Sequence, residues 1–159
     1  MPLLSLPRPG RRVLLAGLLA VLALGPVAAQ RSPRVFAENG VAIRGFDPVA
    51  YFTESRPVKG DPQFHHHWHG ATWHFASARH RDLFAAHPER YAPAYGGFCA
   101  WAVSEGYTAP IDPQAWRIVD GRLFLNYDMS VQRRWETDIP GRIRRGDTNW
   151  PGIAQAAPR

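Results

Sequence analysis

The stretch "FHHHWHGATWHF", residues 64–75, holds five of the chain's seven histidines. His69-Gly70 near its centre is a two-residue turn signal between two runs rich in aromatic residues, so the stretch predicts an antiparallel β-hairpin in which Trp68 pairs with Ala71 and His65 with His74. Alternate residues of a strand share a face. One face then carries His66, Trp68, Ala71 and Trp73, and the other carries His65, His67, Thr72 and His74.

The second of these faces has two interpretations. Cross-strand neighbours lie about 4.5–5.5 Å apart at Cβ, so His65, His67 and His74 could converge on one metal ion, and imidazole suits Zn, Cu or Ni. Alternatively, the face is a solvent-exposed strand surface that tolerates polar rings. A one-residue slip in register would move every side chain to the other face, so the sequence leaves both readings open.

Further short elements are predicted on both sides of this hairpin. Asp47-Pro48 indicates the start of a brief helix, because Asp is a good helix cap and Pro suits the first helical position. Ser77 and Pro88 mark the beginning and end of another helix, and Asp120-Gly121 is the turn of a second hairpin. Short helices are also expected at 98–106, 130–140 and 141–152. The pattern predicts an α+β fold of two small antiparallel β-hairpins packed with short helices.

The chain begins with the features of an export signal. A basic start is followed by an apolar run over Val13–Leu24, and small residues at 27–29 predict a signal peptide over 1–29 that is cleaved after Ala29. The run is too short for a stable membrane anchor. Arg11-Arg12 partly matches a twin-arginine signal, and an ordinary export signal is the alternative. The mature protein is therefore expected in the periplasm or secreted.

The remaining residues are predicted to form one domain. We expect a disordered lead-in over 30–35, the domain over 36–152 and a flexible tail over 153–159. Without the signal peptide, 16 Lys and Arg stand against 13 Asp and Glu. So small an excess does not indicate a nucleic-acid-binding protein. About 130 residues can bury a sufficient core, which the aromatic residues would supply.

Cys99 is the only cysteine, so an internal disulfide is excluded and the thiol is an odd one for an exported protein. It follows Gly96-Gly97 at the start of a predicted helix, where backbone N–H groups favour a thiolate that could ligate a metal, change redox state or act as a nucleophile. Its apolar neighbours equally suit a packed core thiol. His80 lies near the inward face of its helix and could be a ligand or a hydrogen-bonded core histidine.

Residues 44–152 resemble the YHS domain family, in particular its small exported single-domain members. The resemblance rests on "GFDPVAYF" (45–52), "FHHHWHGATWHFASARHRDLFAAHPERYAP" (64–93), "YGGFCAWAVSEG" (95–106), "AWRIVDGRLFLNY" (115–127) and "VQRRWETDIPGRIRRGDTNWP" (131–151). It implies a YHS/TRASH-like fold. The Tyr-His-Ser triplet that names the family corresponds to Phe64-His65-His66, so only His65 matches.

The resemblance also implies where a metal would bind. In the metal-handling branch of the family, cysteines lie at three places, which Ala50, Ala76 and His80 occupy in this sequence. Alanine has no donor atom, whereas imidazole can replace thiolate. If Cys99, His80 and His65 meet under the hairpin, they would form a soft-metal site for Cu or Zn, with Asp47 as an acceptor behind a ligand.

Three functions follow as hypotheses. The first is an exported YHS-type metal-binding or metal-handling module that is not an enzyme. The second is a non-catalytic structural or partner-binding domain that has lost its metal site. The third is a thiol-dependent enzyme with Cys99 as nucleophile and His80 or His65 as base. No phosphate-binding loop, paired catalytic carboxylates or cofactor fingerprint is found in the sequence, so no catalytic or cofactor-binding residues are predicted.

Overall fold

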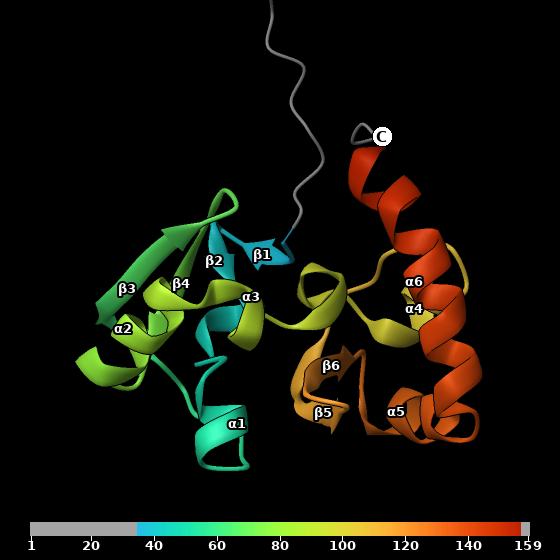
Figure 1. The fold of residues 1–159 in the computed structure, drawn as a ribbon, viewed down its shortest axis with the longest axis horizontal. Helices are drawn as coiled ribbons and strands as arrows, with labels where there is room; N and C mark the ends of the chain where they lie inside the picture. Colours follow the sequence, from blue (N-terminus) through green and yellow to red (C-terminus); the bar gives the residue numbers. More distant parts are fainter. Residues whose placement is uncertain (1–34, 157–159) are drawn as a thin grey trace, which may run out of the picture.

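The computed structural model describes residues 35–156, so the predicted signal peptide and most of the lead-in lie outside the described residues. The described chain has an α+β fold, as predicted (Figure 1). A four-stranded sheet has the order β1-β2-β4-β3, and a separate hairpin pairs β5 with β6. The strands are β1 (Ala37–Glu38), β2 (Val41–Ala42), β3 (Asp61–Trp68), β4 (Ala71–Phe75), β5 (Asp112–Val119) and β6 (Arg122–Asn126).

Short helices flank both sheets. In Figure 1, α1, α2 and α3 lie on the side of the four-stranded sheet, whereas α4, α5 and α6 gather beyond the β5–β6 hairpin. The helices are α1 (Ala50–Thr53), α2 (Ala78–Ala86), α3 (Pro88–Tyr91), α4 (Ala100–Ser104), α5 (Met129–Glu136) and α6 (Ile139–Gln155), with short 3-10 turns η1 (Ile43–Gly45) and η2 (Ala94–Gly97). Within the described residues, no helix is both long and apolar enough to cross a membrane.

The histidine-rich hairpin has the predicted register. Trp68 pairs with Ala71 and His65 with His74. The turn residues His69 and Gly70 both have positive φ, 49° and 78°, as a two-residue hairpin turn requires. Strand β1, which the sequence analysis did not identify, joins the hairpin through β2, which pairs with β4. It has only two residues, too few to produce an alternating pattern.

The second hairpin and most helix ends also follow the sequence. Asp120 and Gly121 form the turn between β5 and β6, both at positive φ. Ser77 accepts a hydrogen bond from the backbone N–H of His80 and so caps α2. Two boundaries differ from those predicted. Val35, expected in the disordered lead-in, is buried in the core, and α6 continues to Gln155, three residues into the predicted tail.

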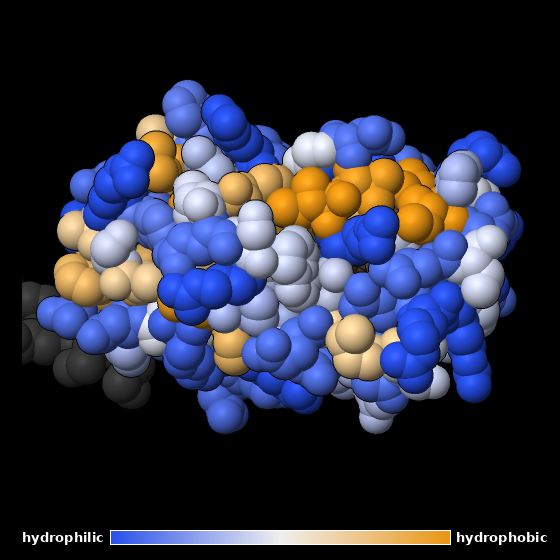
Figure 2. All heavy atoms as spheres, turned by 90° about the horizontal axis from the view of Figure 1, so that it is seen from below, coloured by the Kyte–Doolittle hydropathy of each residue, from blue (hydrophilic) through white to orange (hydrophobic). Residues whose placement is uncertain are grey.

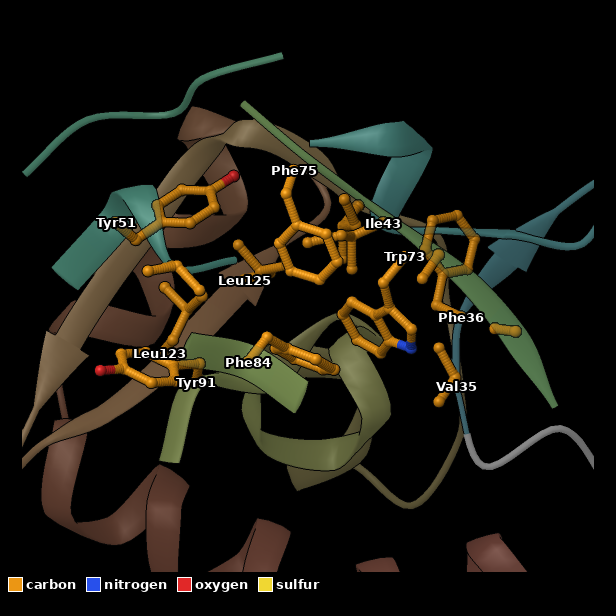
Figure 3. Close-up of a cluster of buried hydrophobic side chains, with 14 of the residues drawn as sticks. Val35, Phe36, Ile43, Tyr51, Trp73, Phe75, Phe84, Tyr91, Leu123 and Leu125 are labelled. Atoms are coloured by element: carbon orange, nitrogen blue, oxygen red, sulfur yellow. The ribbon is translucent and has the colours of Figure 1, made fainter. Parts of the chain in front are cut away.

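The core consists of two clusters. The larger joins the four-stranded sheet to α2 and β6 and includes Trp73, Phe75 and Phe84, whose rings point toward one another in Figure 3. The smaller lies under α6 around Tyr95, Phe124 and Trp135. The larger cluster therefore fixes α2 against the inner face of the β3–β4 hairpin, which determines where His80 points.

Candidate functional site

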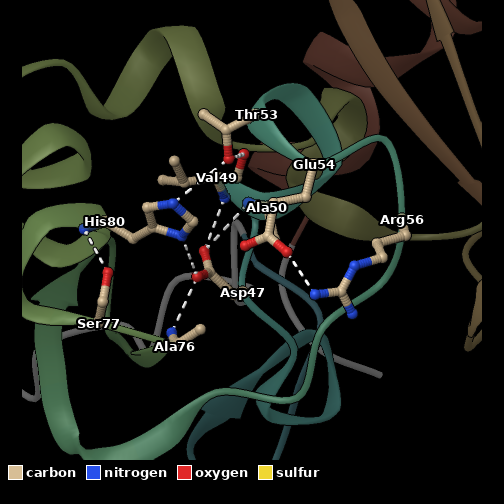
Figure 4. A network of polar contacts seen from close by, with 9 residues as sticks. All are labelled: Asp47, Val49, Ala50, Thr53, Glu54, Arg56, Ala76, Ser77 and His80. Carbon is tan, nitrogen blue, oxygen red and sulfur yellow. Dashed lines mark hydrogen bonds and ion pairs between the residues drawn. The ribbon is translucent and has the colours of Figure 1, made fainter.

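Asp47 is completely buried and its carboxylate accepts four hydrogen bonds (Figure 4). Oδ1 accepts from the backbone N–H groups of Val49 and Ala50, at 2.8 and 3.3 Å. Oδ2 accepts from the backbone N–H of Ala76 at 2.8 Å and from Nδ1 of His80 at 2.6 Å. Asp47 thus caps the turn before α1, as predicted, and also ties that turn to the end of β4 and to α2.

The imidazole of His80 is 7% exposed and both of its ring nitrogens have partners. Nδ1 donates to Asp47, and Nε2 lies 3.3 Å from Oγ1 of Thr53. The Thr53 hydroxyl is also within 3.2 Å of the Val49 carbonyl oxygen, to which it can donate. Asp47, predicted as an acceptor behind one of the metal ligands, accepts from His80, and the pair forms part of a closed hydrogen-bond network without a metal.

The three positions that the sequence resemblance singled out, Ala50, Ala76 and His80, surround this one carboxylate. Ala50 and Ala76 each donate a backbone N–H to Asp47, and His80 donates from its ring. A carboxylate offers about four lone-pair sites, and all four are used. A metal ion at this point would have to displace these hydrogen bonds, and the alanine side chains offer no donor atom in exchange.

Cys99 lies in different surroundings. It is 1% exposed within the larger core cluster, and its Sγ is 3.9 Å from Oδ1 of Asn126. Burial raises the pKa of the Cys99 thiol, although backbone N–H groups such as that of Ala102 act in the opposite direction. The sequence argument that the helix start would favour a thiolate is therefore wrong, because α4 has only five residues and desolvation outweighs its N–H groups.

His65 and His67 are exposed on the outer face of the hairpin. Their ring centroids are 5.6 Å apart. Nδ1 of His65 lies 2.9 Å from the Pro62 carbonyl oxygen. The pKa of His74, on the same face, is lowered by partial burial and by the neighbouring charges of His65 and Lys59.

The structure does not bring the three predicted metal ligands together. His80 faces Asp47 and Thr53, Cys99 faces Asn126, and His65 lies on the outer face of the hairpin, away from the side on which α2 packs. In the part of the chain from 35 to 156, no group of three or more His, Cys, Asp or Glu side chains is arranged to hold a metal ion. Paired with His74 across the strands, His65 is directed outward by strand alternation, which prevents it from reaching His80.

A cleft of about 600 Å³ was not anticipated from the sequence. It lies between the β3–β4 turn, which contributes Trp68, and α6, which contributes Trp150. Tyr95 lies in its wall and donates a hydrogen bond to Asp147 at 2.9 Å, and Arg122 binds the same carboxylate through two nitrogens, at 2.7 and 3.0 Å. These residues come from distant parts of the chain, so no local motif could have grouped them.

Charge in the cleft is largely compensated. The Arg122 guanidinium holds the pKa of the Asp147 carboxyl below its usual range, and burial, followed by the contact with Asp147, raises the pKa of Tyr95. The cleft has the volume of a small-molecule pocket but no nucleophile paired with a base among its described lining residues.

Comparison of the chain with known protein families, with curated proteins and with solved structures finds no match.

Proposed function

We propose that this chain is an exported YHS-type domain that binds a partner without catalysing a reaction, and in which a buried carboxylate has taken the place of a metal site. The observation that carries this proposal is the Asp47 carboxylate, which accepts hydrogen bonds from Ala50, Ala76 and His80, the three positions that hold thiolates in the metal-handling branch.

The electrostatics of the site support this proposal. A metal ion bound by three cysteines would hold these three segments together through its thiolate ligands. One buried anion that accepts hydrogen bonds from the same segments can hold them together instead. Asp47 supplies that anion in a fully buried position. The thiol-enzyme hypothesis gains no support, because Cys99 is buried with a raised pKa and has no imidazole partner among the described residues.

A metal count tests the proposal directly. The mature protein, purified without a His tag, is incubated with Zn²⁺ or Cu(I), desalted and analysed by mass spectrometry for bound metal. We expect far less than one equivalent, with no difference between the wild type and His80→Asn. One tightly held equivalent that is lost in His80→Asn would overturn the proposal.

A gain-of-function variant tests the assignment of the three positions. We expect Ala50→Cys, Ala76→Cys and His80→Cys, combined with Asp47→Ala to vacate the centre, to bind about one equivalent of Zn²⁺, since three thiolates suit that metal. The control carries serines at the same three positions. If circular dichroism shows that the cysteine variant is folded and it still binds no metal, the three positions do not mark a former metal site.

A second candidate function, metal handling by the outer face of the hairpin, is favoured by one observation. The His65 Nδ1–H can donate to the Pro62 carbonyl oxygen, which leaves the Nε2 lone pair available, and a backbone acceptor of this kind commonly orients a ligating histidine. His67 lies beside it. We expect any weak Zn or Cu binding by the wild type to be abolished by His65→Asn with His67→Asn and retained in His80→Asn.

A further inference from the structure

A second hollow, of about 550 Å³, borders the outer edge of strand β5. Trp116, Arg117 and Ile118 of β5 form one side of it, Tyr51 and Phe52 of α1 form another, and Gln132 of α5 closes it. We call this hollow the β5 groove. It lies on the opposite side of the molecule from the cleft beside Trp150, since α1, β5 and α5 form the lower part of Figure 1 and the end of α6 the upper part.

The register of the hairpin leaves part of the β5 edge open. Val119 pairs with Arg122 next to the two-residue turn and Ile118 pairs with Leu123. In a two-residue hairpin the pair beside the turn is hydrogen-bonded and the next is not, so the backbone N–H and C=O groups of Trp116 and Ile118 point away from β6. The Trp116 carbonyl accepts from Nε2 of Gln132 at 3.0 Å, which agrees with this alternation.

Ile118 has no such partner. No hydrogen bond joins its backbone to another element or to a side chain among the described residues. Nearer the start of β5, the hydroxyl of Tyr51 donates to the Pro113 carbonyl, and the register shifts between Asp112 and Trp116. The open part of the edge is therefore the short stretch 116–119.

Gln132 adds an unsatisfied acceptor beside this edge. The residue is 7% exposed, and its Nε2 donates to the Trp116 carbonyl and to Oε1 of Glu136. Because both partners are acceptors, the orientation of the amide is fixed. Oε1 of Gln132 is then a buried oxygen that has no hydrogen-bond donor among the described residues, and an unsatisfied buried acceptor destabilises the fold.

We propose that the β5 groove binds an extended polypeptide segment of a partner protein, which adds to β5 as a further strand. A strand is the ligand that satisfies alternating outward N–H and C=O groups. This partner class is the one that the binding function proposed above would use. The inference rests on that function only in taking the domain to be a binding module.

The walls of the groove indicate what the segment carries. Phe52, Trp116 and Ile118 are only partly buried and belong to the rim of the larger core cluster. Figure 2 shows a gathering of hydrophobic residues on the face seen from below, the side on which α1, β5 and α5 lie. An incoming strand directs alternate side chains to the same face, so apolar side chains at alternate positions would fit these walls.

Another occupant fits less well. The β5 edge lies between α1 and α5. A second copy of this protein that paired through its own β5 would also bring its own α1 and α5 against these helices.

The test uses a phage-displayed library of random linear peptides, selected on the mature protein. We expect enriched peptides with apolar side chains at alternate positions, and amide chemical-shift changes on binding centred on Trp116–Val119. N-methylation of the residues whose N–H groups face β5 should abolish binding, whereas N-methylation of the intervening residues should not. This alternation distinguishes strand addition from simple hydrophobic contact.

Two protein variants complete the test. Ile118→Asp should weaken the selected peptides at least about tenfold, about 1.4 kcal/mol, whereas the control Ile153→Asp changes another partly buried isoleucine, on α6, and should leave binding unchanged. The absence of any enriched peptide, chemical-shift changes at Trp68 and Trp150 instead, or self-association that occupies β5 would each overturn the proposal. If the protein binds metal while peptide binding remains intact, the proposed loss of the metal site is wrong and the strand-addition proposal still stands.

Discussion

Nδ1 of His80 lies 2.6 Å from Oδ2 of Asp47, although the two residues are 33 positions apart in the chain. The contact joins the turn before α1 to the first part of α2, and the same carboxylate holds Ala76 at the end of β4. A single buried side chain thus connects three segments that pack against the same hairpin.

Asp47→Ala should destabilise the protein strongly. The substitution leaves three backbone N–H groups and the His80 ring without their acceptor, and each buried donor left without a partner costs roughly 1–3 kcal/mol. The measurement is the free energy of unfolding in urea. Asp82→Ala, which removes an exposed carboxylate paired only with Arg81, is the matched control and should have little effect. Equal effects of the two variants would contradict the structural role of Asp47.

Two glycines of α6 should respond oppositely to alanine. A Cβ on Gly146 would lie 2.4 Å from the hydroxyl oxygen of Tyr95, whereas nothing lies within 4 Å of a Cβ on Gly152. We expect Gly146→Ala to lower the melting temperature, with an overpacking cost of about 1–3 kcal/mol. Gly152→Ala should raise it, since alanine favours helix by up to about 1 kcal/mol. Calorimetry of both variants checks the prediction, and a stabilising Gly146→Ala would refute it.

Stability should fall in alkaline solution because of Tyr51. Burial, with a smaller contribution from Asp112, raises the pKa of Tyr51 in the folded protein. Between the ordinary tyrosine pKa of about 10 and this higher value, the unfolded chain releases a proton that the folded chain keeps. The stabilisation is therefore complete below about pH 10 and is lost as the pH rises further.

Chemical unfolding at a series of pH values above neutrality measures this effect. Tyr51→Phe should make the alkaline decline shallower but not abolish it, because Tyr95 and Cys99 also have raised pKa values in the folded protein. It should cost about 1 kcal/mol at neutral pH for the lost hydrogen bond to Pro113. Tyr107→Phe is the control, because Tyr107 is 53% exposed. If the alkaline decline in stability is unchanged in Tyr51→Phe, groups other than Tyr51 cause it.

Cys99 should react with a thiol reagent only when the protein unfolds. The side chain is 1% exposed, and burial raises the pKa of its thiol, so both access and thiolate formation oppose the reaction. The labelling rate should rise along the urea unfolding curve. Rapid labelling of the folded protein at neutral pH would instead revive the thiol-enzyme hypothesis.

Local patterns in the sequence predicted much of the fold. The turn dipeptides His69-Gly70 and Asp120-Gly121 placed both hairpins in register, because a two-residue turn leaves one pairing that keeps the apolar face inward. Ser77 predicted the start of α2, because a serine side chain can accept a hydrogen bond from a backbone N–H of the first helical turn. The two-residue strand β1 was missed, since its pairing depends on a neighbouring strand and not on its own residues.

The candidate site was predicted only in part. The sequence pointed to Asp47, both as a cap and as an acceptor behind a ligand, but it could not show that Ala50, Ala76 and His80 donate to the same carboxylate. It also could not place Cys99, because the favourable helix start is a local feature whereas the burial that outweighs it comes from packing.

By itself, then, the sequence determined the elements whose signals lie within a few residues: the two hairpin turns, the helix caps and the alternation of side chains along the hairpin strands. Only the tertiary structure decided what these elements enclose. The Asp47 network, the cleft beside Trp150 and the open edge at Ile118 each combine side chains or backbone groups from distant segments. Their hydrogen bonding and burial are set by the packing of those segments against one another, which no local pattern records.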